Sequence, residues 1–182
     1  MIYPFLILFF LFLIVIFYYN RLVRAKNMVQ EAWSGIDVQL KRRYNLIPNL
    51  TETVQAYAKH EKGLLEEVAR IRTQCMQAKE VGEQSRAENA LTQSLKSIFA
   101  LAEAYPELKA NQNFMELQKN LVEIEDQIQL ARRYYNGSAR DYNIQVESFP
   151  GLIFAKFFSF KSREYFEIEL ATQREVPQVK FS

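Results

Sequence analysis

Apolar and polar residues follow one another along this chain with the spacing of amphipathic helices. From Val29 onward, apolar side chains recur at alternating steps of four and three residues, and the same stripe returns after each of several short breaks. This spacing places the apolar residues on one face of a helix, and no strand-like alternation competes with it. The stripe comprises Val29, Trp33, Ile36, Leu40, Ile47, Leu50, Val54, Tyr57, Leu64, Val68, Ile71, Cys75, Ala78, Leu91, Leu95, Ile98, Ala102, Tyr105, Phe114, Leu117, Leu121, Ile124, Ile128, Ala131 and Tyr135.

The breaks in this pattern predict four helices. Interruptions fall at Pro48, around Gly82 and at Pro106, with a softer one at Gly137. The predicted helices span residues 22–46, 49–80, 86–105 and 111–146. Long helices of the coiled-coil type with short connections predict an all-α fold whose body is an antiparallel four-helix bundle over residues 21–148.

The two prolines differ in what they predict. Proline disfavours helix at the residue before it, so Tyr105-Pro106 is a clear helix end. Pro48 either begins a second helix, where its missing N–H costs nothing, or kinks one long continuous helix. Compactness of the bundle favours the break.

The first twenty residues predict a membrane anchor. Ile2 to Tyr19 is an uninterrupted apolar run of eighteen residues without a charge, enough as a helix to cross a hydrocarbon core of roughly 30 Å. A cleaved signal peptide is the alternative, but it needs a basic segment before the run and small residues after it. Here Tyr18-Tyr19-Asn20-Arg21 follows.

Basic residues directly after the anchor predict its orientation. Arg21, Arg24 and Lys26 precede the first acidic residue, Glu31. By the positive-inside rule the amino terminus lies outside and the body lies in the cytoplasm. The same cations favour anionic inner-leaflet lipids as partners, at about 1 kcal/mol for each basic group near the surface.

Composition excludes most other classes of function. The 23 basic and 21 acidic residues are interleaved, which does not indicate a nucleic-acid-binding protein. One histidine, His60, and one cysteine, Cys75, cannot build a zinc site or an intramolecular disulfide framework. The five glycines are scattered, so no phosphate-binding loop is present. We therefore predict no catalytic residues, metal, cofactor or small-molecule substrate.

Two charges fall on the apolar stripe. Continuing its rhythm from Leu40 lands on Arg43, and continuing it from Tyr57 lands on Glu61. A buried charge must be paired, because leaving it alone costs several kcal/mol. We expect Arg43 to form an ion pair that fixes the helix register, with Glu103 or Glu107 as candidate partners. A ligand-binding arginine and simple exposure are the alternatives.

Arg, Tyr and Asn recur together in KRRYN (41–45), RRYYN (132–136) and RDYN (140–143). Each copy precedes a proline or glycine, so we interpret them as residues that stabilise helix ends and bends. The resulting candidates for structural or interaction roles are Arg43, Tyr44, Asn45, Pro48, Asn49, Glu61, Tyr105, Pro106, Arg133, Tyr135, Asn136, Tyr142 and Asn143.

Residues 149–182 have a different composition. Phe149-Pro150-Gly151 ends the fourth helix, and LIFAKFFSF (152–160) carries four phenylalanines in nine residues. This phenylalanine-rich segment has three possible roles: it covers the end of the bundle, inserts into the membrane surface beside Lys156 and Lys161, or binds a protein partner. We expect the remainder, residues 161–182, to be loosely ordered.

Several segments in this order resemble the bacterial LemA family. They are NRLVRAKNMVQE (20–31), AWSGIDVQLKRRYNLIPNL (32–50), VQAYAKHE (54–61), EAYPELKANQNFMELQKNL (103–121), ARRYYNGSARDYN (131–143) and ESFPGLIFA (147–155). The resemblance implies a membrane-anchored helical-bundle protein of the bacterial inner or cell membrane, without defined catalytic residues. The segment after Ala155 is more aromatic than the family pattern, so its role does not carry over.

Anchor, amphipathic helices and missing chemistry together favour a non-enzymatic membrane scaffold or adaptor. Exposed apolar surfaces make it a candidate homo-oligomer. The alternative is a regulatory or accessory subunit of a membrane protease or other envelope complex, with a membrane protein as partner. An enzyme is the least supported class.

Overall fold

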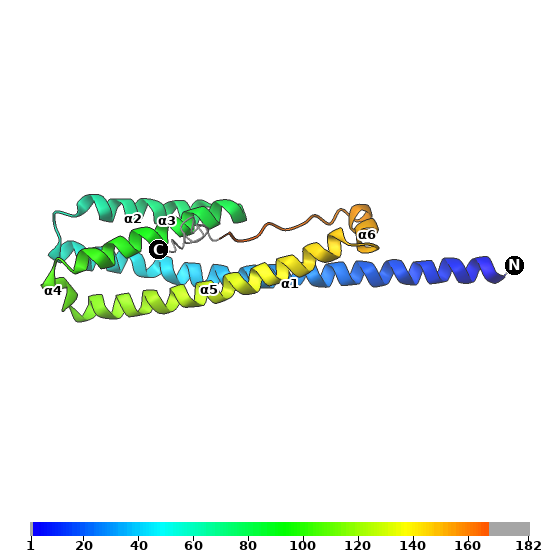
Figure 1. Ribbon diagram of the computed structural model, residues 1–182, viewed down its shortest axis with the longest axis horizontal. Helices are drawn as coiled ribbons and strands as arrows, with labels where there is room; N and C mark the ends of the chain where they lie inside the picture. The colour runs from blue at the N-terminus through cyan, green and yellow to red at the C-terminus, as the bar shows by residue number, and fades with distance from the viewer. Residues whose placement is uncertain (1, 168–182) are drawn as a thin grey trace, which may run out of the picture. The chain divides into compact units, whose positions relative to one another are not determined.

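A computed structural model describes residues 2–167 of the chain, and within that range the protein is helical with no strand (Figure 1). The part of the predicted C-terminal segment from residue 168 to 182 lies outside the described residues. The helices are α1 (Ile2–Tyr57), α2 (Lys62–Gln77), α3 (Val81–Ala102), α4 (Pro106–Lys109), α5 (Gln112–Glu147) and α6 (Gly151–Phe157).

The chain divides into two compact units. Of the described residues, unit 1 holds 2–49 and 115–165, and unit 2 holds 50–114, 166 and 167. Unit 1 therefore contains most of α1 and α5 together with α6. Unit 2 contains the last turns of α1, the helices α2 to α4 and the first turn of α5.

The predicted break at Pro48 is wrong, because α1 continues through it to Tyr57. A proline inside a helix costs about 3 kcal/mol. Its neighbours on the apolar face, Ile47 and Leu50, are buried to 1% and 0% exposure, and burying such a side chain contributes roughly 1.5–3 kcal/mol. The buried face thus outweighs the proline, and Pro48 itself faces solvent.

In unit 1, α1 and α5 pack side by side in opposite directions (Figure 1). Trp33 meets Tyr135 edge to face, with ring centroids 5.4 Å apart, and Arg43 binds Glu125. In both pairs the two residue numbers add to 168, which defines the register. Five further pairs in this register are buried on both sides and form the seam between the two helices. They are Leu22–Val146, Val29–Ala139, Ile36–Arg132, Leu40–Ile128 and Ile47–Leu121.

Arg43 is fully buried, as its place in the stripe predicts, and its Nη1 lies 2.5 Å from Oε2 of Glu125. The predicted partners Glu103 and Glu107 are wrong in this respect. Either acid could reach Arg43 only if the chain turned near Pro48, whereas α1 continues through Pro48 and Arg43 lies against α5. Glu103 instead binds Lys109 at 2.5 Å.

In unit 2, α2 and α3 form an antiparallel hairpin (Figure 1). Val68, Ile71 and Cys75 of α2 are buried, as the stripe predicts, and Leu91, Leu95 and Ile98 of α3 are buried as well. The stripe on α3 extends about two turns further toward its start than the apolar residues reveal, since Gln84, Ser85 and Glu88 are also buried. Gln84 donates a hydrogen bond of 2.8 Å to Glu88.

The turn after α1 occupies residues 58–61, where no proline or glycine predicts it. Glu61 lies in this turn, directly before α2, and its side chain makes no capping hydrogen bond, so its predicted place on a helical core stripe is wrong. Its carboxylate accepts a hydrogen bond of 3.2 Å from the hydroxyl of Tyr105. Burial and the Glu61 carboxylate raise the pKa of Tyr105 above its ordinary value of 10.0.

The predicted break at Tyr105-Pro106 is confirmed, since Pro106 begins α4, although α3 already ends at Ala102. Asn111 then caps α5: its side-chain oxygen accepts from the backbone N–H of Phe114 at 3.0 Å. The amide of the same side chain donates to the Tyr57 hydroxyl at 2.9 Å. Through Asn111, these bonds link the end of α1 to the start of α5.

The first part of α1 is the one described helix long and apolar enough to cross a membrane. Its large apolar side chains from Tyr3 to Leu13 are 46–79% exposed. The all-α fold with an N-terminal candidate span is thus observed, while the antiparallel four-helix bundle and the boundaries 1–20, 21–148 and 149–182 stay predictions.

We expect the two halves of the Arg43–Glu125 pair to differ in their contribution to stability. Glu125→Gln removes the negative charge beside a buried guanidinium and is expected to lower the free energy of unfolding by about 1–3 kcal/mol. Arg43→Met keeps most of the apolar volume and leaves a carboxylate that is already 28% exposed, so it is expected to cost less.

The measurement is denaturant unfolding of the detergent-solubilised full chain, followed by fluorescence of Trp33, the single tryptophan of the chain. The control is Asp37→Asn, which removes the exposed 2.6 Å pair with Lys41 on the same helix and is expected to cost less than about 0.5 kcal/mol. A larger loss for Arg43→Met than for Glu125→Gln would contradict this account.

Candidate functional site

Aromatic side chains gather where the apolar run of α1 ends. The ring of Tyr18 stacks on Phe154 of α6, with centroids 4.8 Å apart and planes within 6°. Tyr19 meets Phe158 and Phe160 edge to face at 4.9 and 6.0 Å. We call Tyr18, Tyr19, Phe154, Phe158 and Phe160 the aromatic cluster. It joins the chain's C-terminal part to α1 at the position where the anchor is predicted to leave the membrane.

The end of α6 aims this cluster at α1. The N–H of Phe160 donates to the carbonyl of Ala155 at 2.9 Å, and the N–H of Ser159 donates to that of Lys156 at 3.3 Å. This is the Schellman pattern of helix ends. Ser159 takes the left-handed conformation that it requires, with φ of 58°. The chain therefore reverses sharply and returns Phe160 to Tyr19.

Gly151 lets α6 approach α5 closely. A Cβ at this buried position would lie 2.2 Å from the carbonyl oxygen of Gln145. No side chain fits there without displacing the backbone of one of the two helices. A glycine is thus required where the chain turns from α5 into α6.

Residues 160–165 run from α6 back along α5, held by side chains of the Arg-Tyr-Asn motifs. The Asn143 amide donates to the carbonyl of Arg163 at 2.9 Å, and its oxygen accepts from the Arg163 N–H at 2.7 Å. The Tyr135 hydroxyl donates to the carbonyl of Glu164 at 2.9 Å. The expectation that this stretch is loosely ordered is wrong for residues 161–167, where Ser85 also donates to the carbonyl of Glu167.

The interpretation of these motifs as helix ends and bends is also wrong. KRRYN lies inside α1 and RRYYN inside α5, which runs through Gly137 without a break. Their polar groups serve tertiary contacts instead. Asn143, Tyr135 and Tyr142 are 1–7% exposed beneath the returning segment, where a backbone without helical hydrogen bonds needs partners.

Burial changes the acidity of both tyrosines. Desolvation raises the pKa of Tyr135 above 10.0; the positive charge of Arg163 opposes the shift and the negative charge of Glu164 adds to it. Desolvation likewise raises the pKa of Tyr142, against the charge of Arg163. Both hydroxyls are therefore neutral at physiological pH.

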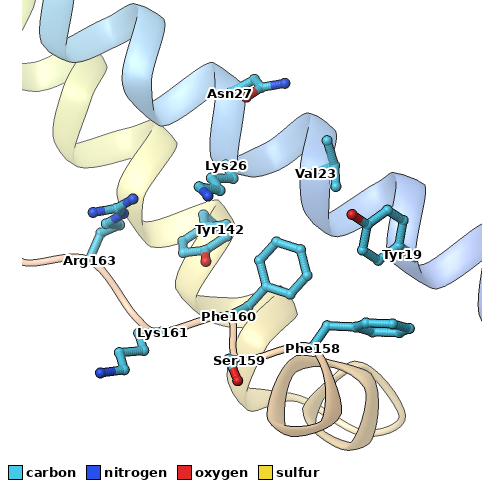
Figure 2. Close-up of a pocket in the computed structure, with 10 residues that line it drawn as sticks. All are labelled: Tyr19, Val23, Lys26, Asn27, Tyr142, Phe158, Ser159, Phe160, Lys161 and Arg163. Carbon is cyan, nitrogen blue, oxygen red and sulfur yellow. The ribbon is translucent and has the colours of Figure 1, made fainter.

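A pocket of about 580 Å³ opens beside the aromatic cluster (Figure 2). Helix α1 contributes Tyr19, Val23, Lys26 and Asn27, helix α5 contributes Tyr142, and the C-terminal part contributes Phe158, Ser159, Phe160, Lys161 and Arg163. Figure 2 shows the rings of Tyr19 and Phe158 on one side and the side chains of Lys26 and Arg163 on the other. Among the described residues that line it, none is acidic.

The structure brings only some of the predicted site residues together. Tyr135, Tyr142, Asn143 and Lys26 meet around the returning segment, while Glu61 and Tyr105 meet in unit 2. Asn45, Pro48, Asn49, Arg133, Arg21 and Arg24 lie on the surface, Tyr44 is buried, and Asn136 is half-buried. Sequence reasoning missed Arg132, which is 1% exposed, although the spacing from Ile128 to Tyr135 passes through it.

The described part of the chain contains no cluster of metal-ligating side chains. No group of three His, Cys, Asp or Glu side chains is placed to hold a metal ion among residues 2–167. His60 lies exposed in the turn after α1, and Cys75 is buried in α2. The arrangement at the aromatic cluster can bind an anion or a ring, and it holds no nucleophile beside a general base.

We expect Gly151→Ala to detach α6. The added methyl group collides with the Gln145 carbonyl, so the free energy of unfolding should fall by about 1–3 kcal/mol. Gly137→Ala is the matched control on α5, because nothing lies within 4 Å of its Cβ position, and alanine in a helix interior should stabilise by about 0.5–1 kcal/mol. Thermal unfolding followed by circular dichroism measures both. Equal effects of the two substitutions would refute the close approach.

We expect Tyr135→Phe to show its effect mainly below pH 10. At neutral pH the variant loses the hydrogen bond to Glu164, about 0.5–1.5 kcal/mol. Because the folded pKa of Tyr135 is raised, its stabilising contribution is complete below the unfolded value of 10.0 and is lost as pH rises through the folded value. The stability difference between natural protein and variant should therefore narrow above pH 10, as measured by denaturant unfolding. Tyr134→Phe, at a neighbour that is 55% exposed, should change nothing at either pH.

Comparison with known proteins gives the chain its family. It is 26% identical over 175 residues to Magnetosome protein MamQ 2 of Paramagnetospirillum magneticum, covering 82% of this chain and 64% of that protein. It is 25% identical over 174 residues to Magnetosome protein MamQ of Magnetospirillum gryphiswaldense, with 81% and 64% covered. It is 29% identical over 155 residues to Protein LemA of Metamycoplasma hominis, with 80% and 69% covered.

The chain thus spans somewhat under two thirds of the length of the magnetosome relatives. The model of the LemA family matches residues 32–181. This match takes in α5, α6 and the returning segment, and it confirms the resemblance seen in the sequence motifs. The chain belongs to the LemA family.

Proposed function

We propose that the protein is a non-enzymatic, single-pass membrane scaffold or adaptor that presents helices at the cytoplasmic face of the bacterial membrane. The observation that carries this proposal is the form of α1. Its exposed apolar first part continues without a break into the segment that packs on α5. An anchor and a packed body on one rigid helix hold that body at a set distance from the bilayer.

Exposure of the apolar run supports the anchor. Phe5, Leu8 and Phe12 are 60–73% exposed, and each such side chain costs roughly 1.5–3 kcal/mol in water relative to an apolar environment. Eighteen residues of helix span about 27 Å, close to the roughly 30 Å of hydrocarbon. Tyr18 and Tyr19 then lie where aromatic belts occur.

Charge supports the orientation. Arg21 and Arg24 are exposed directly after the run, and basic residues beside a span favour the cytoplasmic side. We therefore place the amino terminus outside and both compact units in the cytoplasm, at the inner membrane.

Exposed apolar side chains in unit 1 support self-association. Val38 on α1 and Val122, Leu130 and Ile144 on α5 are 52–53% exposed. They lie outside the seam between the two helices and offer a surface for another copy of the chain. The antiparallel four-helix bundle and the homo-oligomer are parts of this proposal. The names LemA and MamQ are not enzyme names, which is consistent with a non-catalytic role.

Topology is tested by cysteine labelling in intact cells with a membrane-impermeant maleimide. Lys59→Cys, exposed in the turn after α1, should react only after permeabilisation. The natural chain is the control, because its single cysteine, Cys75, is buried and should react only after unfolding. Labelling of Lys59→Cys in intact cells would overturn the orientation, and release of the natural chain from membranes by alkaline carbonate would overturn the anchor.

Assembly is tested on the detergent-extracted full chain by light scattering coupled to size exclusion. A scaffold should give one uniform species larger than a single chain. A monomer would remove self-association from the proposal and favour an accessory subunit that docks on another membrane protein.

A further inference from the structure

We propose that the pocket beside the aromatic cluster binds the phosphate of an anionic phospholipid from the cytoplasmic leaflet. This inference deepens the proposed function and rests on its membrane anchor. The occupant is identified by three observations: the depth of the pocket along α1, the charge of its lining and its apolar wall.

The depth follows from the position of the pocket on α1. Tyr19 is the last residue of the apolar run, and Lys26 lies seven residues further, which is about 10 Å along a helix. The headgroup layer beyond each face of the hydrocarbon core is roughly 5–8 Å thick. A pocket lined by α1 from Tyr19 to Lys26 therefore begins at the edge of the hydrocarbon core and spans the headgroup layer to its cytosolic side.

The charge of the lining suits a phosphate. Lys26, Lys161 and Arg163 line the pocket, and none of the three forms an ion pair with a carboxylate of the described residues. Basic side chains recognise phosphate oxygens through charge-assisted hydrogen bonds. The hydroxyl of Ser159 and the amide of Asn27 add neutral donors to the same lining.

The fold holds these cations in place from two directions. Lys26 projects from α1, whereas Lys161 and Arg163 come from the segment that returns along α5. The backbone of Arg163 is held at both its N–H and its carbonyl by the buried Asn143 side chain. The Schellman turn at Ser159 holds the other end of this segment. The site is thus built by tertiary contacts rather than by a flexible basic tail.

The apolar wall distinguishes a lipid from a soluble phosphate. The rings of Tyr19, Phe158 and Phe160 line the pocket beside the cations (Figure 2). On α6, which directly precedes Phe158, Ile153 and Phe157 are 57% and 79% exposed. Such exposure is expected of apolar side chains that contact the membrane interface. A phospholipid presents a phosphate next to apolar glycerol esters and chains, which matches this juxtaposition. The volume of about 580 Å³ is in the usual range of ligand pockets.

The experiment uses the full chain in non-ionic detergent and counts bound lipids by native mass spectrometry. The probes are short-chain phosphatidylglycerol, phosphatidylcholine with the same chains, and glycerol phosphate. We expect phosphatidylglycerol to bind at least about tenfold more tightly than phosphatidylcholine, because both lipids carry the phosphate but the choline cation of phosphatidylcholine is repelled by Lys26, Lys161 and Arg163. Glycerol phosphate should bind far more weakly than phosphatidylglycerol.

The test variant carries Lys161→Gln and Arg163→Gln together. Both residues are exposed, and the bonds that hold Arg163 to Asn143 are made by its backbone, so the fold should persist, as circular dichroism will show. The matched control carries Lys119→Gln and Arg133→Gln, two exposed cations of α5 that do not line the pocket. The test variant should lose the preference for phosphatidylglycerol by about tenfold, and the control should keep it.

Three results would overturn the inference. Equal binding of the two lipids would show that the pocket does not distinguish an anionic headgroup from a zwitterionic one. Equal losses in the test and control variants would show diffuse attraction, and equally tight binding of glycerol phosphate would make the occupant a soluble phosphate. Retention of the chain in membranes after alkaline carbonate separates these failures from a failure of the anchor, which would end both proposals.

Discussion

The antiparallel seam between α1 and α5 is the constraint on which unit 1 depends. It runs from Leu22 opposite Val146 to Ile47 opposite Leu121, in the single register marked by the Trp33–Tyr135 and Arg43–Glu125 pairs. Burial of apolar side chains stabilises the seam along its whole length, because the free energy gained is roughly proportional to the apolar area removed from water. The buried Arg43 adds selectivity, since a shift along the seam would separate its charge from Glu125 and leave it in an apolar interior.

The arrangement of α6 and the returning segment in unit 1 follows from this register. It sets the last turn of α5 beside Leu22, so that the turn through Gly151 brings α6 against Tyr18. The Arg-Tyr-Asn motifs of α5 then hold the returning segment by its backbone, through Asn143 and Tyr135. The pocket exists because three separate parts of the chain meet there. A change in the seam would therefore alter the pocket without touching any residue that lines it.

The proposed scaffold and the proposed lipid site describe one physical arrangement. A long helix that passes from lipid into a packed body transmits the position of the membrane directly to that body. The aromatic cluster fills the space where helix, body and bilayer would meet, and the cations around it face the headgroup layer. In this arrangement the C-terminal part of the chain acts as a second contact with the membrane surface, beside the anchor.

Much of this protein could be predicted from the sequence by itself. Local spacing and local propensity predict the helices, the apolar run of eighteen residues and the break at Tyr105-Pro106. They also predict the burial of Cys75 and of Arg43. Such properties depend on residues that are neighbours in the sequence, and the motifs that indicate the LemA family are likewise short contiguous segments.

Tertiary structure decided the rest, because the deciding contacts join residues far apart in the chain. Pro48 stays helical since Ile47 and Leu50 are buried against other helices, a gain that no local rule includes. Arg43 binds Glu125 and not the predicted acids because α1 does not turn where the proline suggested. Asn143 and Tyr135 look like residues of helix ends, yet they bind a backbone segment 20 and 29 residues further on. The pocket arises only once that segment has returned, and so no stretch of sequence predicts it.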